Sequence, residues 1–238
     1  MSVIKSSDLP GVPLSEQAYL VLRKAILANV LAPGYFASER EVSERFGLSR
    51  TPVREALLKL RDEGLIEVQP RRGVRVLPLS VKDMREIHQV ARALELEAAL
   101  LLCEREGDEP LKALAQSAQD MRDAIKVKDR DKWVEADAKF HIGIVASSKN
   151  DRLIQQYNSL RVLTDRARLF VLYIRELPVQ STKEHIDMLV AIEARNKTEI
   201  ASLYRSHWER TTNEIISIIE EFNRRRSGDV PDSQIMVP

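Results

Sequence analysis

The segment from Pro33 to Val76 constrains the fold of this chain more than any other. It contains two short helical patterns, one over residues 38–46 and one that starts at 49 or 51 and runs to 63, and they are joined at residues 47–49. Two short runs of β-type residues follow, at 65–68 and 74–77, and they flank a basic turn. This order of elements is that of a winged helix-turn-helix, which places its second helix in the major groove of DNA.

The ends of these helices carry recognisable signals. Ser38 is a favourable N-cap, and Glu41 lies in the first turn that follows it. Gly47 can adopt the positive φ that ends a helix, and Pro52 stands in the first turn of the next helix, where its missing N–H costs little. A further helical stripe over 15–29 precedes this pair. The three helices and the hairpin predict one small DNA-binding domain.

The beginning of the second helix of this pair has the chemistry of groove recognition. Arginine side chains at 50 and 54 can pair with guanine, and each such pair contributes about 1–3 kcal/mol of discrimination. Hydroxyls beside them, together with the helix amides, can hold phosphates. Gly73 allows the wing to approach a groove closely. The residues predicted to contact DNA are Arg40, Ser49, Arg50, Thr51, Arg54, Arg71, Arg72 and Gly73.

The same stretch resembles the DNA-binding domain of GntR-family bacterial transcription factors. The resemblance rests on the pattern P-G-x-x-x-S-E-R-E-V-S-E-R-F-G-L-S-R-T-P-V-R-E-A-L-x-x-L-x-x-E-G-L-I and covers about residues 14–77. It assigns DNA contacts to Arg40, Arg50 and Arg54, with Ser49, Thr51 and Gly73 in support. Ala37 stands where the family usually has a larger aliphatic residue, a difference that concerns packing.

The remaining sequence has helical periodicity and no convincing strand, so the fold class is mainly α, with an all-α helical bundle after the winged domain. No apolar run approaches the roughly 20 residues of a membrane span. The single cysteine and the lack of a signal-peptide pattern favour a cytoplasmic protein. The predicted domains are 8–78, 80–226 and a flexible tail at 227–238. The predicted helices of the second domain are 81–105, 110–127, 130–147, 151–174, 181–195 and 197–223.

Three of the four histidines in this second domain share a helix face with apolar residues. Asp137 and His141 are four residues apart, so both point to the same apolar side. His185 and His207 each lie on the apolar face of another helix, whereas His88 is predicted at the surface or at the edge of a pocket. From the residues alone, these groups form either a metal site or a hydrogen-bonded polar network. Imidazoles with one carboxylate suit zinc first, and also nickel, manganese, cobalt or iron.

The order D-x-x-x-H, E-H and H-W resembles the FCD domain, the all-helical ligand-binding domain of FadR-type GntR regulators. The likeness spans about residues 80–222, and six helices are typical of the shorter, VanR-like branch. It implies a divalent metal ion, with zinc as the first choice, bound by Asp137, His141, His185 and His207. It also implies a small carboxylate effector, and Arg92 matches an arginine that the family often turns toward it. Alternatively, Arg92 is a surface residue of its helix that pairs with Glu95 or Glu97. Arg168 and Asn158 are further candidates on the polar face of their helix.

These patterns predict a ligand-responsive bacterial transcription factor, a repressor that binds a palindromic DNA operator as a homodimer. An organic acid bound at the metal site would control it. One alternative is a direct metal sensor without an organic effector. Another is a metalloenzyme, although no further inward acid or base is evident near the ligands. A third is an architectural DNA binder that responds to no ligand.

Overall fold

The second helix begins where its sequence predicts. In this computed structural model, the Ser38 hydroxyl accepts a hydrogen bond from the amide of Glu41 at 3.2 Å, and the Glu41 carboxylate accepts one from the amide of Ser38 at 2.7 Å. This reciprocal pair satisfies two amides that the helix cannot. Gly47 ends the helix in the left-handed conformation, with φ at 65°. The turn then leads directly into the third helix.

The structure describes residues 11–70, 72–105, 107, 109–172 and 174–226, without the side chains of 225 and 226. It divides into two compact units, which meet in the sequence between Leu79 and Ser80. We call residues 11–79 the winged unit and residues 80–226 the helical unit. The tail predicted at 227–238 lies outside the described residues. No helix in the described part of the chain is long and apolar enough to cross a membrane.

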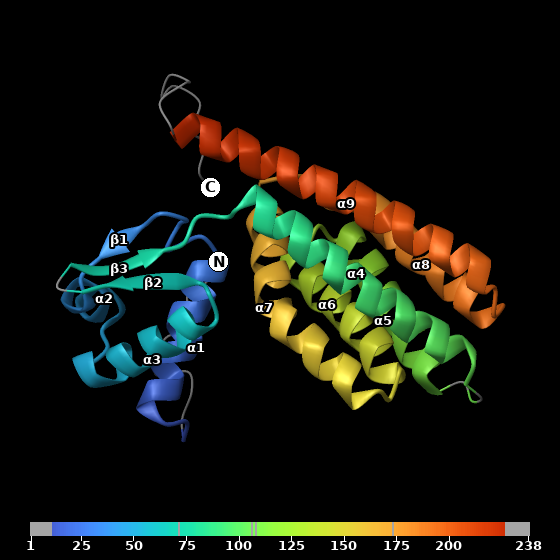
Figure 1. Cartoon of the computed structure of the whole chain (residues 1–238), viewed down its shortest axis with the longest axis horizontal. Coiled ribbons are helices and arrows are strands. Elements are labelled where there is room, and N and C mark those ends of the chain that lie inside the picture. Colours follow the sequence, from blue (N-terminus) through green and yellow to red (C-terminus); the bar gives the residue numbers. More distant parts are fainter. Residues whose placement is uncertain (1–10, 71, 106, 108, 173, 227–238) are drawn as a thin grey trace. The chain divides into compact units, whose positions relative to one another are not determined.

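The winged unit combines three helices with a small antiparallel sheet in the order β1-β3-β2 (Figure 1). Leu22, Val53 and Leu60 are fully buried between the helices and the sheet. The β2–β3 hairpin is the predicted wing. The sequence did not predict β1, which has only two residues and exists through its pairing with β3. The elements are α1 (Leu14–Leu27), β1 (Phe36–Ala37), α2 (Glu39–Phe46), α3 (Arg50–Asp62), β2 (Ile66–Gln69) and β3 (Gly73–Val76).

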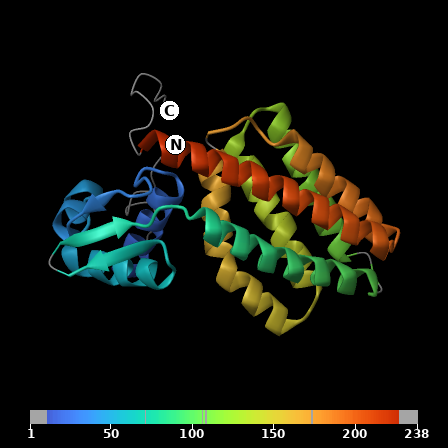
Figure 2. The same ribbon diagram turned by 45° about the horizontal axis from the view of Figure 1, so that its top comes forward.

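The helical unit contains six helices among its described residues, and the mainly α fold class is confirmed. Figures 1 and 2 both show the long helix α9 running beside α8 and α4. The helices end within a few residues of the predicted bounds. They are α4 (Val81–Cys103), α5 (Glu109–Lys126), α6 (Arg130–Ser147), α7 (Asp151–Leu172), α8 (Val179–Glu193) and α9 (Lys197–Arg226).

Helix α4 is central to the packing of this unit, because α6, α7, α8 and α9 all contact it. Ala91 and Ala98 are fully buried on its inner face, and their small side chains let the neighbouring helices come close. Phe140 and Ile144, on the inner face of α6, are also fully buried. Side chains from these five helices can therefore meet in one interior region, and the polar cluster described below lies there.

Candidate functional site

The start of α3 presents polar and basic side chains to solvent. Arg50, Thr51 and Arg54 are all exposed, and α3 has no acidic residue in its first turn. Ser49 is the N-cap of this helix, but its hydroxyl makes no capping hydrogen bond. A helix N-terminus with unoccupied donors and two arginines is suited to bind phosphates and base edges.

The other residues predicted to contact DNA differ in their environments. Arg40 is exposed and lies 3.7 Å from Glu44 in an ion pair at the surface of α2. Arg72 is exposed at the tip of the wing, whereas Arg71 lies outside the described residues. Gly73 has a φ of 136°, and a Cβ atom there would lie 2.3 Å from the carbonyl oxygen of Ala37. Close packing of β3 against β1 therefore explains why residue 73 is glycine. Close approach of the wing to a DNA groove is not needed to explain it.

Three histidines meet in the interior of the helical unit. His141 on α6, His185 on α8 and His207 on α9 have 3%, 0% and 3% of their surface exposed. One ring nitrogen from each lies within 4.8 Å of the other two, the kind of grouping that can hold a metal ion. In a tetrahedral site, two nitrogens bound to one ion at about 2.0–2.1 Å each are about 3.4 Å apart, so the rings would have to approach one another by up to about 1.4 Å to share an ion.

Each imidazole has a different partner on its Nδ1 atom. His141 Nδ1 lies 2.9 Å from the Glu95 carboxylate, and His207 Nδ1 lies 2.6 Å from that of Glu184. His185 Nδ1 faces the thioether sulfur of Met121 at 3.4 Å. The Nε2 atoms of His141 and His185 are buried and have no hydrogen-bond partner. Buried polar atoms without partners are rare, and here they are donor atoms of the kind a metal ion uses.

Asp137 lies between the histidines and an arginine. Its Oδ1 atom is 3.6 Å from His141 Nε2 and 3.8 Å from His185 Nδ1, while its Oδ2 atom is 3.2 Å from Arg168. Burial raises the pKa of this carboxyl, but Arg168 and His141 outweigh burial and hold the pKa well below its ordinary value. Asp137 is thus an ionised carboxylate with one oxygen directed toward His141 and His185.

The histidines differ in their affinity for protons. Burial and neighbouring cations lower the pKa values of His185 and His207, although Glu184 opposes the effect at His207. At His141, burial and Arg168 also disfavour the proton, but Glu95 and Asp137 prevail and raise its pKa to about 9. A metal ion binds the neutral imidazole. Two of the three rings are therefore held in the metal-binding form, and the third would exchange its proton for the ion.

The three effector candidates occupy unequal positions. Arg168 on α7 pairs with Asp137 and so lies next to the histidine cluster. Arg92 instead forms a 3.7 Å ion pair with Glu209, a largely exposed residue. Asn158 is exposed on α7, while its neighbour Tyr157 is buried. The turn of α7 directs residue 157 inward and residue 158 outward, so Asn158 lies on the polar face, as its sequence predicts. Arg92 is partly exposed, and the ion pair with Glu209 is the contact it makes.

Two buried polar residues of α4 were missed or misplaced from the sequence. Glu95 is fully buried, and its carboxylate accepts hydrogen bonds from His141 at 2.9 Å and from Tyr157 at 2.5 Å. The expectation that no further inward acid lies near the ligands is therefore wrong. His88 is 4% exposed, so a surface position is also wrong; its ring contacts Trp208 edge-on at 5.2 Å. The sequence does contain a signal for the burial of both residues, because positions 88, 91, 95 and 98 lie on one face of the helix and two of them are alanine.

Comparison with known proteins relates each unit to a described family. Residues 14–76 match the family described as bacterial regulatory proteins, gntR family, and residues 86–210 match the FCD domain. The chain is 29% identical over 212 residues to the HTH-type transcriptional repressor RspR of Escherichia coli, covering 89% of this chain and 93% of that protein. It is 32% identical over 155 residues to the gluconate operon transcriptional repressor of Bacillus licheniformis, covering 62% and 63% of the two chains.

A solved structure shares the fold. The E. coli protein McbR/YncC superposes on this chain with a TM-score of 0.71 at 21% sequence identity. The match covers 89% of this chain and 99% of that one. The arrangement of elements is therefore one that an experimental structure also contains.

Proposed function

Because the chain belongs to the GntR family of bacterial regulatory proteins and carries an FCD domain, we propose that it represses transcription as a homodimer under the control of a small carboxylate bound at a metal ion. Membership of this family makes it a DNA-binding transcription regulator rather than an enzyme. Two relatives, RspR and the gluconate operon regulator, are named repressors, which supports repression here. A protein that binds the bacterial chromosome acts in the cytoplasm.

The DNA contacts are proposed at the exposed beginning of α3. Arg50 and Arg54 would pair with base edges, and Ser49 and Thr51 would hold phosphates. One winged unit offers few base contacts, so operator selectivity requires two of them. Two copies related by a two-fold axis would recognise a palindromic operator, with half-sites about one helical turn apart.

The observation that carries the metal proposal is the meeting of His141, His185 and His207 in the interior, with two Nε2 atoms lacking any hydrogen-bond partner. Asp137 would supply a fourth ligand atom through Oδ1. Zinc is the first choice for this donor set, and nickel, manganese, cobalt and iron are compatible. A bound ion with an open coordination position binds carboxylate oxygen directly. Arg168 beside Asp137 would add positive charge for the same ligand.

Control of DNA binding follows from linkage between the two sites. An effector that binds one arrangement of the helical unit more tightly favours that arrangement in the dimer. If the favoured arrangement changes the spacing of the two recognition helices, operator affinity falls by the coupling free energy, which is typically about 1–3 kcal/mol. The relative named for the gluconate operon makes sugar acids a sensible first group of effectors to screen.

The proposal is tested by elemental analysis of the purified protein beside a variant with four substitutions, Asp137→Asn, His141→Gln, His185→Gln and His207→Gln. The expected result is about one metal ion per chain in the native protein and almost none in the variant. Operator release by a panel of small carboxylates should then occur with the native protein alone. A well-folded native protein without metal would show that the four residues form a polar network.

Near-complete burial of the three histidines favours a second candidate, in which the ion itself is the signal. A direct metal sensor needs no organic ligand. Its operator affinity would follow the free metal concentration in a carboxylate-free buffer. An operator affinity that is independent of metal until a carboxylate is added would exclude it.

A further inference from the structure

We propose that Glu184 is a positioning residue for metal binding, which holds Nδ1 of His207 so that the Nε2 lone pair of that ring faces the ion. This inference rests on the metal site of the proposed function and adds a residue that contacts no ion itself. It also gives a role to the first member of the E-H pair at 184–185, whose second member is a proposed ligand.

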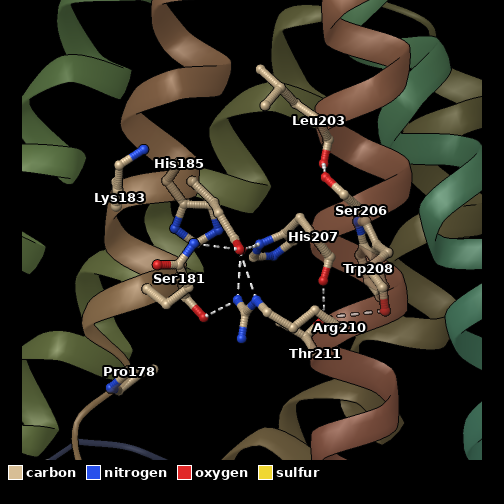
Figure 3. A network of polar contacts seen from close by, with 12 residues as sticks. Pro178, Ser181, Lys183, His185, Leu203, Ser206, His207, Trp208, Arg210 and Thr211 are labelled. Atoms are coloured by element: carbon tan, nitrogen blue, oxygen red, sulfur yellow. Dashed lines mark hydrogen bonds and ion pairs between the residues drawn. The ribbon is translucent and has the colours of Figure 1, made fainter.

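The geometry around Glu184 is that of a carboxylate fixed in place. Its Oε2 atom lies 2.6 Å from His207 Nδ1, and Arg210 donates to both carboxylate oxygens, at 2.7 and 2.5 Å. Arg210 is itself held by the Ser181 hydroxyl at 2.9 Å and by Glu214 at 3.2 Å. Figure 3 shows His185 and His207 facing one another from α8 and α9, with Ser181 and Arg210 beside them.

The direction of the bond between Glu184 and His207 follows from chemistry. Arg210 donates to both oxygens of Glu184 in a two-point ion pair, and the carboxylate of such a pair has no proton to donate. Nδ1 of His207 must therefore donate, which selects the tautomer whose Nε2 atom is unprotonated. A carboxylate on the far nitrogen also fixes the ring orientation and increases its basicity as a ligand.

The Nδ1 partners of the three histidines differ, and this difference distinguishes the proposed role of Glu184. His141 has an equivalent partner in Glu95, which is fully buried. His185 has only the Met121 thioether, a weak acceptor, at 3.4 Å. Two of the three rings are thus anchored by carboxylates on α4 and α8. Glu184 is easier to substitute than the fully buried Glu95. Its side chain is partly exposed, and its removal leaves Arg210 paired with Glu214.

The test is a Co²⁺ titration of the metal-stripped, full-length protein, in competition with a chromogenic chelator. Glu184→Ala should weaken Co²⁺ binding about 10- to 100-fold, the usual effect of removing such a partner. Glu184→Gln, whose amide oxygen still accepts from Nδ1, should recover part of this loss. Asp187→Asn is the matched control, because Asp187 is a carboxylate on the same helix that pairs with Lys183 at the surface; its binding should stay within about twofold of native.

A second measurement separates positioning from a general effect on folding. In the zinc-loaded native protein, ¹⁵N spectra of the histidine rings should show His207 protonated at Nδ1 and metal-bound at Nε2. Glu184→Ala should lose or redistribute this pattern, and Glu184→Gln should retain it. If Glu184→Ala does not fold, the affinity and spectrum of Glu184→Gln decide the question, since this substitution conserves shape.

The outcomes distinguish this inference from the proposal on which it rests. Native-like affinity and an unchanged His207 spectrum in Glu184→Ala would overturn the positioning role and leave the metal site intact. Failure of the native protein to bind Co²⁺ or Zn²⁺ would overturn the metal site itself. Weaker binding with a changed His207 spectrum, in a variant whose metal-free thermal midpoint is unchanged, supports positioning by Glu184.

Discussion

The two units of this protein place their functional residues in opposite environments. In the winged unit, the four DNA contacts proposed at the beginning of α3, namely Ser49, Arg50, Thr51 and Arg54, are exposed and neighbours in the sequence. In the helical unit, the proposed ligands are at most 5% exposed and come from three helices, with buried partners on two others. The residues that contact an external partner can be close together in the sequence, because the partner supplies the other side of the interface. The ligands of an internal ion must surround it, so they come from helices that are far apart in the sequence.

This contrast determines how each unit responds to substitution. An exposed arginine can be removed without creating a cavity or leaving a buried group unpaired, so only recognition suffers. A buried histidine is part of the core and of the polar network at once. The predictions below test whether function and stability separate in the first unit and remain linked in the second, and they run from the largest expected effect to the smallest.

The largest effect is expected from His185→Ala. This residue is fully buried, and its Nε2 atom has no hydrogen-bond partner. Its Nδ1 atom faces the Met121 thioether, whereas the Nδ1 atoms of the other two histidine ligands are paired with carboxylates. Losing a ligand should exceed the ~10- to 100-fold loss caused by removing its supporting groups. Metal content after dialysis should fall from about one ion per chain to nearly none.

The matched control is His88→Ala, since His88 is also a buried histidine of the same unit, but its Nδ1 atom pairs with Thr212 at 2.8 Å and its ring is not one of the three that meet in the cluster. It should keep its metal despite a comparable loss of packing. Full occupancy in His185→Ala, or an equal loss in His88→Ala, would contradict the ligand assignment.

The next effect concerns the winged unit and Arg54→Ala. If Arg54 reads a base, its removal should cost about 1–3 kcal/mol of binding free energy for each half-site. Specific binding to an operator selected from random DNA should be nearly lost, while binding to unrelated DNA changes little. Arg61→Ala serves as the control, because Arg61 carries the same charge at the far end of α3 and pairs with Asp62. Unchanged operator affinity in Arg54→Ala would remove this residue from the interface.

The smallest effect is a pH dependence of stability caused by His88. Burial, assisted by Arg168, lowers the pKa of His88 to about 4, while an unfolded chain has the ordinary value near 6.5. Between these values the unfolded state binds the proton and the folded state does not. Stability should therefore fall as the pH falls from about 6.5 toward 4, by roughly 1 kcal/mol per pH unit from this residue alone.

Urea unfolding of the native protein and of His88→Gln, at several pH values, isolates this contribution. Both tryptophans, Trp133 and Trp208, lie in the helical unit, so their fluorescence reports that unit alone. The free energy of unfolding should depend less steeply on pH in the variant. Parallel pH profiles for the two proteins would show that His88 is not held neutral.

Much of the architecture could be predicted from the sequence, because it depends on local signals. Ser38 and Gly47 mark the ends of α2 through their own conformations, and the bounds of the six later helices agree with helical periodicity in the sequence to within a few residues. Strand β1 could not be predicted, since two residues carry no periodicity and pair only because β3 lies beside them. The necessity of Gly73 depends on the same contact with Ala37.

For the candidate metal site, the sequence by itself determined that the four proposed ligands face inward, but it missed Glu95 and misplaced His88. The spacing of Asp137 and His141, and the apolar faces around His185 and His207, were enough to predict their burial. The tertiary structure alone decided what those groups meet. It brought Glu95 to His141 and Glu184 to His207, turned Arg168 toward Asp137, and paired Arg92 with Glu209. Helical periodicity fixes the direction of a side chain on its own helix, whereas its partner depends on how separate helices pack.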